Sequence, residues 1–164
     1  MAQNGAFRTI GKDPKTGLPK TYILKPRDYS VTLHHNGTAG ATVPGTINID
    51  PDAPFILRRL YMSDSADPSI TVNGMANQYE NLVLLQDNSN NYSWENQFVP
   101  RSEFAGTREL PRVLEDEVLI NANTRFTITI QEPAATSGTN STAADGYTVI
   151  SLCGYSLYPV ASNN

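Results

Sequence analysis

The stretch "VLEDEVLINANTRFTITI", residues 113–130, decides the fold of this chain. Over residues 118–130 every even position is apolar except Thr124, and every odd position is polar except Leu119. A period of two places alternate side chains on one face, which is typical of a β-strand that buries that face. The stretch therefore predicts either one strand or two strands that are bent at residues 121–123.

Three consecutive carboxylates, Glu115, Asp116 and Glu117, precede this alternating run. Asp116 would continue the inward face, so we expect the strand to begin after it and the triplet to lie in the loop at its entry. Like charges at that place discourage pairing with the edge of another chain. A catalytic carboxylate pair requires burial, and a calcium site requires several converging oxygens in a spacing that is absent here. The triplet therefore predicts a solvated loop or a subunit contact, with no metal and no cofactor.

Strand-like segments recur along the rest of the chain. Residues 54–63 and 147–160 carry apolar side chains on both faces, which predicts central strands. Residues 75–86 also fit one face of a short helix. The remaining predicted strands are residues 29–34, 46–50, 69–72 and 81–86. About eight to ten short strands with turn signals between them predict an all-β protein, either a β-sandwich or a barrel.

The N-terminal segment differs in composition from the rest of the 164-residue chain. Residues 1–20 are rich in Gly and Pro and have little to bury, so we expect an extended arm and a single domain over residues 21–164. Residues 1–28 contain six basic and two acidic side chains, a net charge of +4, whereas the rest contains six Arg and 14 acids, a net charge of −8. Such asymmetry marks an interaction tail, whose predicted contact residues are Arg8, Lys12, Lys15 and Lys20.

Motifs for catalysis are missing from the sequence. There is no P-loop, no dinucleotide fingerprint and no G-x-S-x-G elbow. His34 and His35 would point to opposite faces of a strand, and Cys153 stands between apolar neighbours, where a small core residue is expected rather than a nucleophile. The sequence therefore predicts a protein that is not an enzyme and has no catalytic residues.

Other binding classes receive less support. Trp94 and Tyr92 could form a platform for a sugar, so a carbohydrate-binding module stays open, although core packing is the commoner role of a single Trp. The acidic body argues against nucleic acid as a partner. No apolar run approaches the roughly 20 residues that span a bilayer, and the N-terminus has no apolar leader, so we expect synthesis without export and no membrane contact.

A second group of charged residues precedes the acidic triplet. Arg101, Arg108 and Arg112 alternate with acids just before it. Arginine is the cation preferred for bidentate pairing with carboxylates. Two interpretations remain: an internal salt-bridge network around a long loop, or a subunit interface in which the triplet of one protomer meets arginines of the next.

Two motifs carry a resemblance to a known family. "DAPFILRRLYMSD" at residues 52–64 and "RELPRVLEDEVLINANTRFTITI" at residues 108–130 lie on either side of a polar middle. Over residues 45–132 this layout resembles jelly-roll head proteins of tailed bacteriophages that decorate or cement the capsid, and also some phage tail and neck proteins. The resemblance implies an antiparallel, jelly-roll-like β-sandwich, often trimeric, whose extended N-terminal arm clasps the shell.

The resemblance also supplies the expected function. It implies a structural virion protein that binds and bridges subunits of the major capsid protein, or contacts another virion protein, and that forms a homo-oligomer, with a trimer favoured. Its expected location is the capsid surface of the virion after synthesis in the host cytoplasm. A phage tail or neck component and a carbohydrate-binding β-sandwich module are the alternatives.

Overall fold

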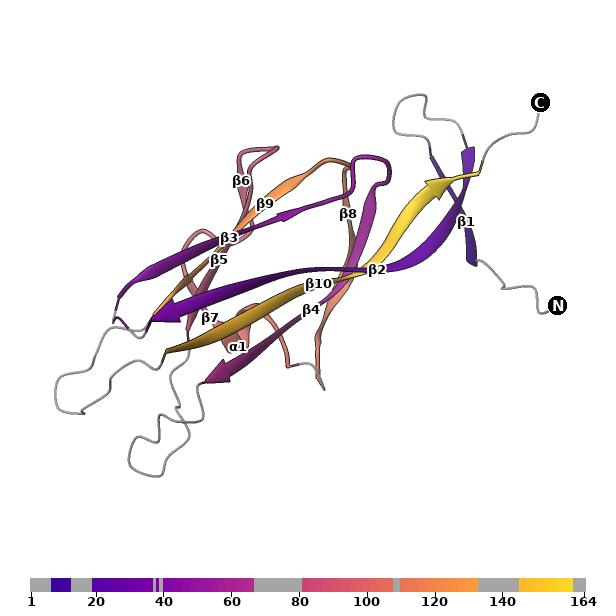
Figure 1. Ribbon diagram of the computed structural model, residues 1–164. Coiled ribbons are helices and arrows are strands. Elements are labelled where there is room, and N and C mark those ends of the chain that lie inside the picture. The colour runs from indigo at the N-terminus through magenta and orange to yellow at the C-terminus, as the bar shows by residue number, and fades with distance from the viewer. Residues whose placement is uncertain are drawn as a thin grey trace.

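The computed structural model describes residues 7–12, 19–36, 38, 40–66, 81–107, 110–132 and 145–160. These residues form two antiparallel sheets packed face to face, with a single helical turn, α1 (Arg101–Phe104) (Figure 1). The predicted all-β sandwich is confirmed. The first sheet has the spatial order β1 (Phe7–Lys12), β2 (Pro19–Asn36), β10 (Asp145–Pro159), β4 (Phe55–Ala66) and β8 (Arg112–Ile120). The second has the order β3 (Thr42–Asn48), β9 (Arg125–Gln131), β5 (Leu82–Asp87) and β6 (Tyr92–Ser93), and β7 (Val99–Pro100) also pairs with β5.

The strand order is that of a jelly roll. If β1 is left out and the short β6 and β7 are counted as one, eight strands remain. In chain order, the first, eighth, third and sixth of them form one sheet, and the second, seventh, fourth and fifth form the other. Except for the fourth and fifth, which pair with each other, successive strands therefore cross between the sheets, as in two Greek keys.

The stretch at residues 113–130 forms two strands that belong to different sheets. β8 ends at Ile120 in the first sheet and β9 begins at Arg125 in the second. The turn between them contains Asn123 with φ of 62° and is tied by the Asn123 N–H to the carbonyl of Asp50 at 3.1 Å. Because both sheets face the same core, the even positions stay inward through the crossing, which explains the unbroken period of two.

The acidic triplet lies inside β8, so the predicted loop before the strand is wrong. Leu57 of β4 pairs with Val118, but Arg59 pairs with Val113, so four residues of β8 lie opposite Arg58 alone. A bulge of this kind interrupts the alternation of faces. Glu115, Asp116 and Glu117 are consequently all exposed. Among the described strands β8 pairs only with β4, so it is one of the two edges of the first sheet, opposite β1.

The N-terminal residues that are described form a strand. β1 pairs with residues 19–24 of β2, so the predicted boundary after residue 20 falls inside β2. Figure 1 shows β1, the start of β2 and the end of β10 reaching beyond the two packed sheets. At residues 82–87 the chain is the strand β5, so the helical alternative is wrong there, and the predicted strand at residues 69–72 lies outside the described residues.

The core lies between the sheets and is aliphatic with aromatic contacts. Tyr29 meets Phe55 edge-on, with ring centroids 5.0 Å apart, and Trp94 meets Phe126 in the same way at 6.0 Å. Such pairs contribute about 0.5–1.5 kcal/mol beyond their buried area. Core packing of Trp94 is thus confirmed. The fully buried side chains of the core include Phe55, Leu57, Val83, Leu85, Phe104, Ile128, Ile130, Ile150 and Leu152.

Candidate functional site

A β-bulge in β4 places two consecutive arginines on the outer face of the first sheet. On β10, Cys153 pairs with Arg59 and Gly154 pairs with Leu57, which leaves Arg58 as the extra residue. The same residue is skipped in the pairing with β8. Before the bulge Leu57 faces the core, and after it Leu60 does. Because the bulge shifts the phase by one residue, both arginines point outward and neither enters the core.

Gly154 on β10 makes this bulge possible. A Cβ atom built on residue 154 would overlap the carbonyl oxygen of Ile56 and would lie 3.1 Å from the ring of Phe55. Only glycine allows the backbones of β10 and β4 to approach this closely, which is a recognised role of glycine in a strand. The bulge is therefore held from both strands.

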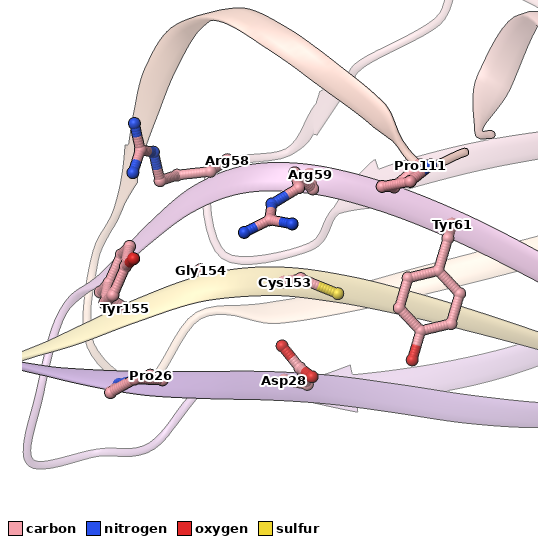
Figure 2. Close-up of a pocket in the computed structure, with 9 residues that line it drawn as sticks. All are labelled: Pro26, Asp28, Arg58, Arg59, Tyr61, Pro111, Cys153, Gly154 and Tyr155. Carbon is pink, nitrogen blue, oxygen red and sulfur yellow. The ribbon is translucent and has the colours of Figure 1, made fainter. Parts of the chain in front are cut away.

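The arginines border a shallow depression on three adjacent strands. Its volume is about 220 Å³. Figure 2 shows the guanidinium of Arg59 lying over β10 near Cys153, with Tyr61 on one side and Tyr155 on the other. Asp28 reaches the same depression from β2 (Figure 2). The described residues that line it are Pro26, Asp28, Arg58, Arg59, Tyr61, Pro111, Cys153, Gly154 and Tyr155.

The acidic triplet adjoins this depression through one ion pair. Arg58 Nε lies 2.9 Å from Glu117 Oε1, and its guanidinium also lies over the ring of Tyr155, 5.8 Å from the centroid. The two side chains are 46% and 55% exposed, so the pair contributes no more than about 1 kcal/mol. In the described part of the chain, Glu115 and Asp116 form no ion pair.

Cys153 lies in the depression and not in the core, so its predicted place is wrong. The neighbouring Leu152 takes the inward position on β10 and leaves the thiol half-buried on the outer face. Burial, reinforced by the carboxylate of Asp28, raises the pKa of the Cys153 thiol to about 12, although Arg59 opposes the shift. The thiol is therefore protonated at neutral pH, and a protonated thiol is a poor nucleophile.

The other predicted arginines have different partners. Arg112 donates from Nη1 to the carbonyls of Glu103 and Phe104, the second at 2.9 Å, so its guanidinium holds α1 instead of a carboxylate of the triplet. Arg101 belongs to α1, where its backbone N–H donates to the carbonyl of Asn81 at 3.0 Å. Arg108 lies outside the described residues. Arg112 therefore contacts backbone carbonyls, whereas the choice between an internal salt-bridge network and a subunit interface stays open for Arg101 and Arg108.

The described basic residues of the predicted arm lie in or opposite the part of β2 that precedes the residues lining the depression. Arg8 pairs with Ile23 and Lys12 pairs with Pro19, both at the β1–β2 hairpin. Lys20 lies on β2 opposite Gly11 of β1, and Lys15 lies outside the described residues. The structure therefore places the basic hairpin and the arginine depression as two separate surfaces.

Sequence reasoning missed the residues that build the depression, above all Arg59, Tyr61 and Asp28. The signal was present in "FILRRLYM", where the inward residues change from odd to even positions across the two arginines. Such a change of phase within one strand indicates a bulge.

Neither a metal cluster nor a membrane-spanning helix is present among the described residues. His34 packs against Tyr147, with ring centroids 4.7 Å apart. A scan against protein-family models, a search of the curated proteins and a search of the solved structures each found no match to this chain.

Proposed function

We propose that this chain is a structural protein of a virus particle, a capsid decoration or cement protein that binds and bridges subunits of the major capsid protein. Its open β8 edge carries this proposal. Val113 and Leu119 of β8 are 66% and 59% exposed and lie on either side of the acidic triplet, and Leu110, just before the strand, is 79% exposed. Large apolar side chains on an unpaired edge strand are an aggregation hazard unless a partner covers them. An interface at β8 gives them a partner.

The jelly-roll strand order supports the same proposal. It agrees with the fold implied by the resemblance to phage head proteins, although fold alone does not assign function. The hairpin that reaches beyond the sandwich carries basic residues, and the body is acidic, so two surfaces of opposite charge are available for contacts within a shell. The expected assembly is a homo-oligomer, with a trimer as the resemblance implies.

The alternatives receive different support. A phage tail or neck component uses the same kind of interface and stays the second candidate. A carbohydrate-binding module loses part of its platform, because Trp94 packs against Phe126 and only Tyr92 of that pair is highly exposed, at 61%. No enzymatic role is proposed.

Binding to capsids tests the proposal. Shells of the major capsid protein assembled without this chain are mixed with the purified protein and sedimented, and electron microscopy then locates the bound chain. We expect saturable co-sedimentation, with a loss of binding for the Val113→Asn/Leu119→Asn variant. The matched control is Arg125→Glu, because Arg125 is an exposed residue of β9 in the other sheet. Wild-type protein that stays in the supernatant at every concentration would exclude a decoration role.

A further inference from the structure

The depression on the outer face contains an arginine that forms no ion pair within the described part of the chain. Arg58 is occupied by Glu117, but Arg59, which is also exposed, forms no ion pair with any described residue. The bulge of β4 and Gly154 of β10 fix the backbone from which Arg59 projects. A guanidinium that projects from a fixed backbone and has no ion-pair partner among the described residues is suited to bind an anion from outside the chain.

The shape and lining favour a carboxylate side chain as that anion. About 220 Å³ is less than the 300 Å³ or more of typical small-molecule pockets, so the depression fits a protein side chain better than a whole small ligand. A guanidinium binds a carboxylate through two parallel hydrogen bonds. Tyr61 and Tyr155 flank Arg59 and offer phenol hydroxyls and ring faces to the same guest (Figure 2).

We propose that the Arg59 depression binds the carboxylates of residues 115–117 of a second copy of this chain. Glu115 and Asp116 are exposed and have no ion-pair partner among the described residues. Glu117 of the same copy already forms an ion pair with Arg58 at the bulge of β4, so a carboxylate fits against this bulge. Each copy thus presents acids and a free arginine side by side, and it gives the acids to one neighbour while it receives the acids of another.

Charge favours a contact between the acids of one copy and Arg59 of another over a contact in which the β8 edges of two copies pair with each other. If two β8 edges paired antiparallel, their triplets would face each other, and like charges opposite one another destabilise a sheet. Residues 29–164 contain six Arg and 14 acids, so bodies of this chain repel each other unless their arginines lie in the contact.

This inference deepens the proposed function, because it names the self-contact that an oligomeric decoration protein would use. Sedimentation velocity of the purified chain over a range of concentrations tests it without capsids. We expect the wild type to form a closed oligomer. Arg59→Glu and the Glu115→Lys/Asp116→Lys variant should both dissociate at least about tenfold more readily. The variant that combines all three changes should reassociate, because it restores opposite charges. Arg125→Glu is the control and should behave like the wild type.

Two further variants strengthen the test. Arg59→Gln keeps the size of the side chain and should weaken association even if Arg59→Glu does not fold, as judged by circular dichroism. Asp28→Asn should strengthen association, because it removes a negative charge that would repel an incoming carboxylate. A wild type that is monomeric at its highest soluble concentration overturns the proposal, as does a combined variant that stays dissociated or an Asp28→Asn variant that weakens association. These outcomes leave the capsid experiment unaffected, so the two proposals can fail separately.

Discussion

Arg58 of β4 and Glu117 of β8 meet at 2.9 Å where the bulges of two neighbouring strands lie opposite each other. Arg58 is the single residue that β4 leaves unpaired, and Glu117 belongs to the four residues that β8 leaves unpaired. The ion pair therefore connects the unpaired residue of β4 with the unpaired segment of β8, and the two together form one bulge. Its strength is modest because both side chains are half-exposed. Its consequence is positional, since it sets the acidic triplet beside the arginine depression.

Substitution of Gly154 should unfold the bulge. Gly154→Ala places a methyl group on the carbonyl of Ile56, which is backbone and cannot move aside without breaking the pairing of β10 with β4. We expect the free energy of unfolding to fall by more than about 2 kcal/mol, as measured by urea denaturation. Ser156→Ala on the same strand is the control. The buried Ser156 hydroxyl has no hydrogen-bond partner among the described residues, so its removal should be neutral or stabilising. Equal losses in the two variants would contradict the role given to Gly154.

Glu95 should lower stability at neutral pH. Its Oε2 accepts a hydrogen bond from the Leu85 N–H at 3.2 Å, but burial raises the pKa of the Glu95 carboxyl, and that hydrogen bond and the charge of Arg112 only partly oppose the shift. A carboxyl whose pKa is higher in the folded state adds stability below its unfolded pKa and loses it as the pH rises through the folded pKa.

Glu95→Gln keeps an oxygen acceptor for Leu85 without a buried charge. We therefore expect the variant to be more stable than the wild type at pH 7, and the difference to shrink as the pH falls toward about 4. Urea denaturation at the two pH values measures it. Glu115→Gln, at an exposed position, is the matched control and should show no such pH-dependent gain. A less stable Glu95→Gln variant at pH 7 would show that the carboxylate is net stabilising.

Alkylation of Cys153 should report the charges in the depression. Because the pKa of its thiol is raised to about 12, iodoacetamide should react slowly at pH 8 and faster once the chain is unfolded in urea. Asp28→Asn should speed the reaction of the folded protein, because the Asp28 carboxylate raises the pKa of the Cys153 thiol. Arg59→Gln should slow it, because Arg59 lowers the pKa. If Asp28→Asn slowed the alkylation and Arg59→Gln sped it, the thiol of Cys153 would not lie beside these two charges as described.

The sequence predicted the sandwich because alternation is a local signal. Residues 118–130 keep a period of two through the crossing between sheets, so both strands could be read directly. The crossing itself was left open, because a straight strand and a bent pair give the same pattern. The jelly-roll order came from the family resemblance, since alternation does not state which strands are neighbours.

The candidate site was not predictable in the same way. The triplet was placed in a loop because Asp116 would otherwise face inward, and only the register between β4 and β8 reveals that four residues bulge outward. Cys153 was placed in the core because β10 carries apolar residues on both faces. Its sequence therefore does not reveal which of the two faces points outward. Arg59 becomes a site residue through Gly154 and Asp28 from other strands, which lie next to it only after folding.

Removal of residues 1–20 separates folding from assembly. Of the described strands, β1 pairs with β2 alone, and it lies at one edge of the first sheet, beyond the packed sheets in Figure 1. Its loss uncovers Tyr22, whose ring would lie 3.3 Å from a Cβ atom built on Gly11, but it leaves the core between the sheets intact. We expect strand content and melting temperature to stay nearly unchanged, with a stability loss below about 2 kcal/mol.

The same deletion removes Arg8, Lys12, Lys15 and Lys20, so it should release the protein from capsids. Circular dichroism beside co-sedimentation with capsids measures both effects. A chain with those four residues changed to Gln and the hairpin retained is the matched control: it should also lose binding if charge is the cause, and high salt should mimic it because exposed charges are screened over about 10 Å at 0.1 M. If the truncated chain unfolds, β1 is an essential strand of the sandwich. If it folds and still binds at full occupancy, the basic hairpin does not clasp the shell, and the capsid contact must lie elsewhere, with the β8 edge as the next surface to test.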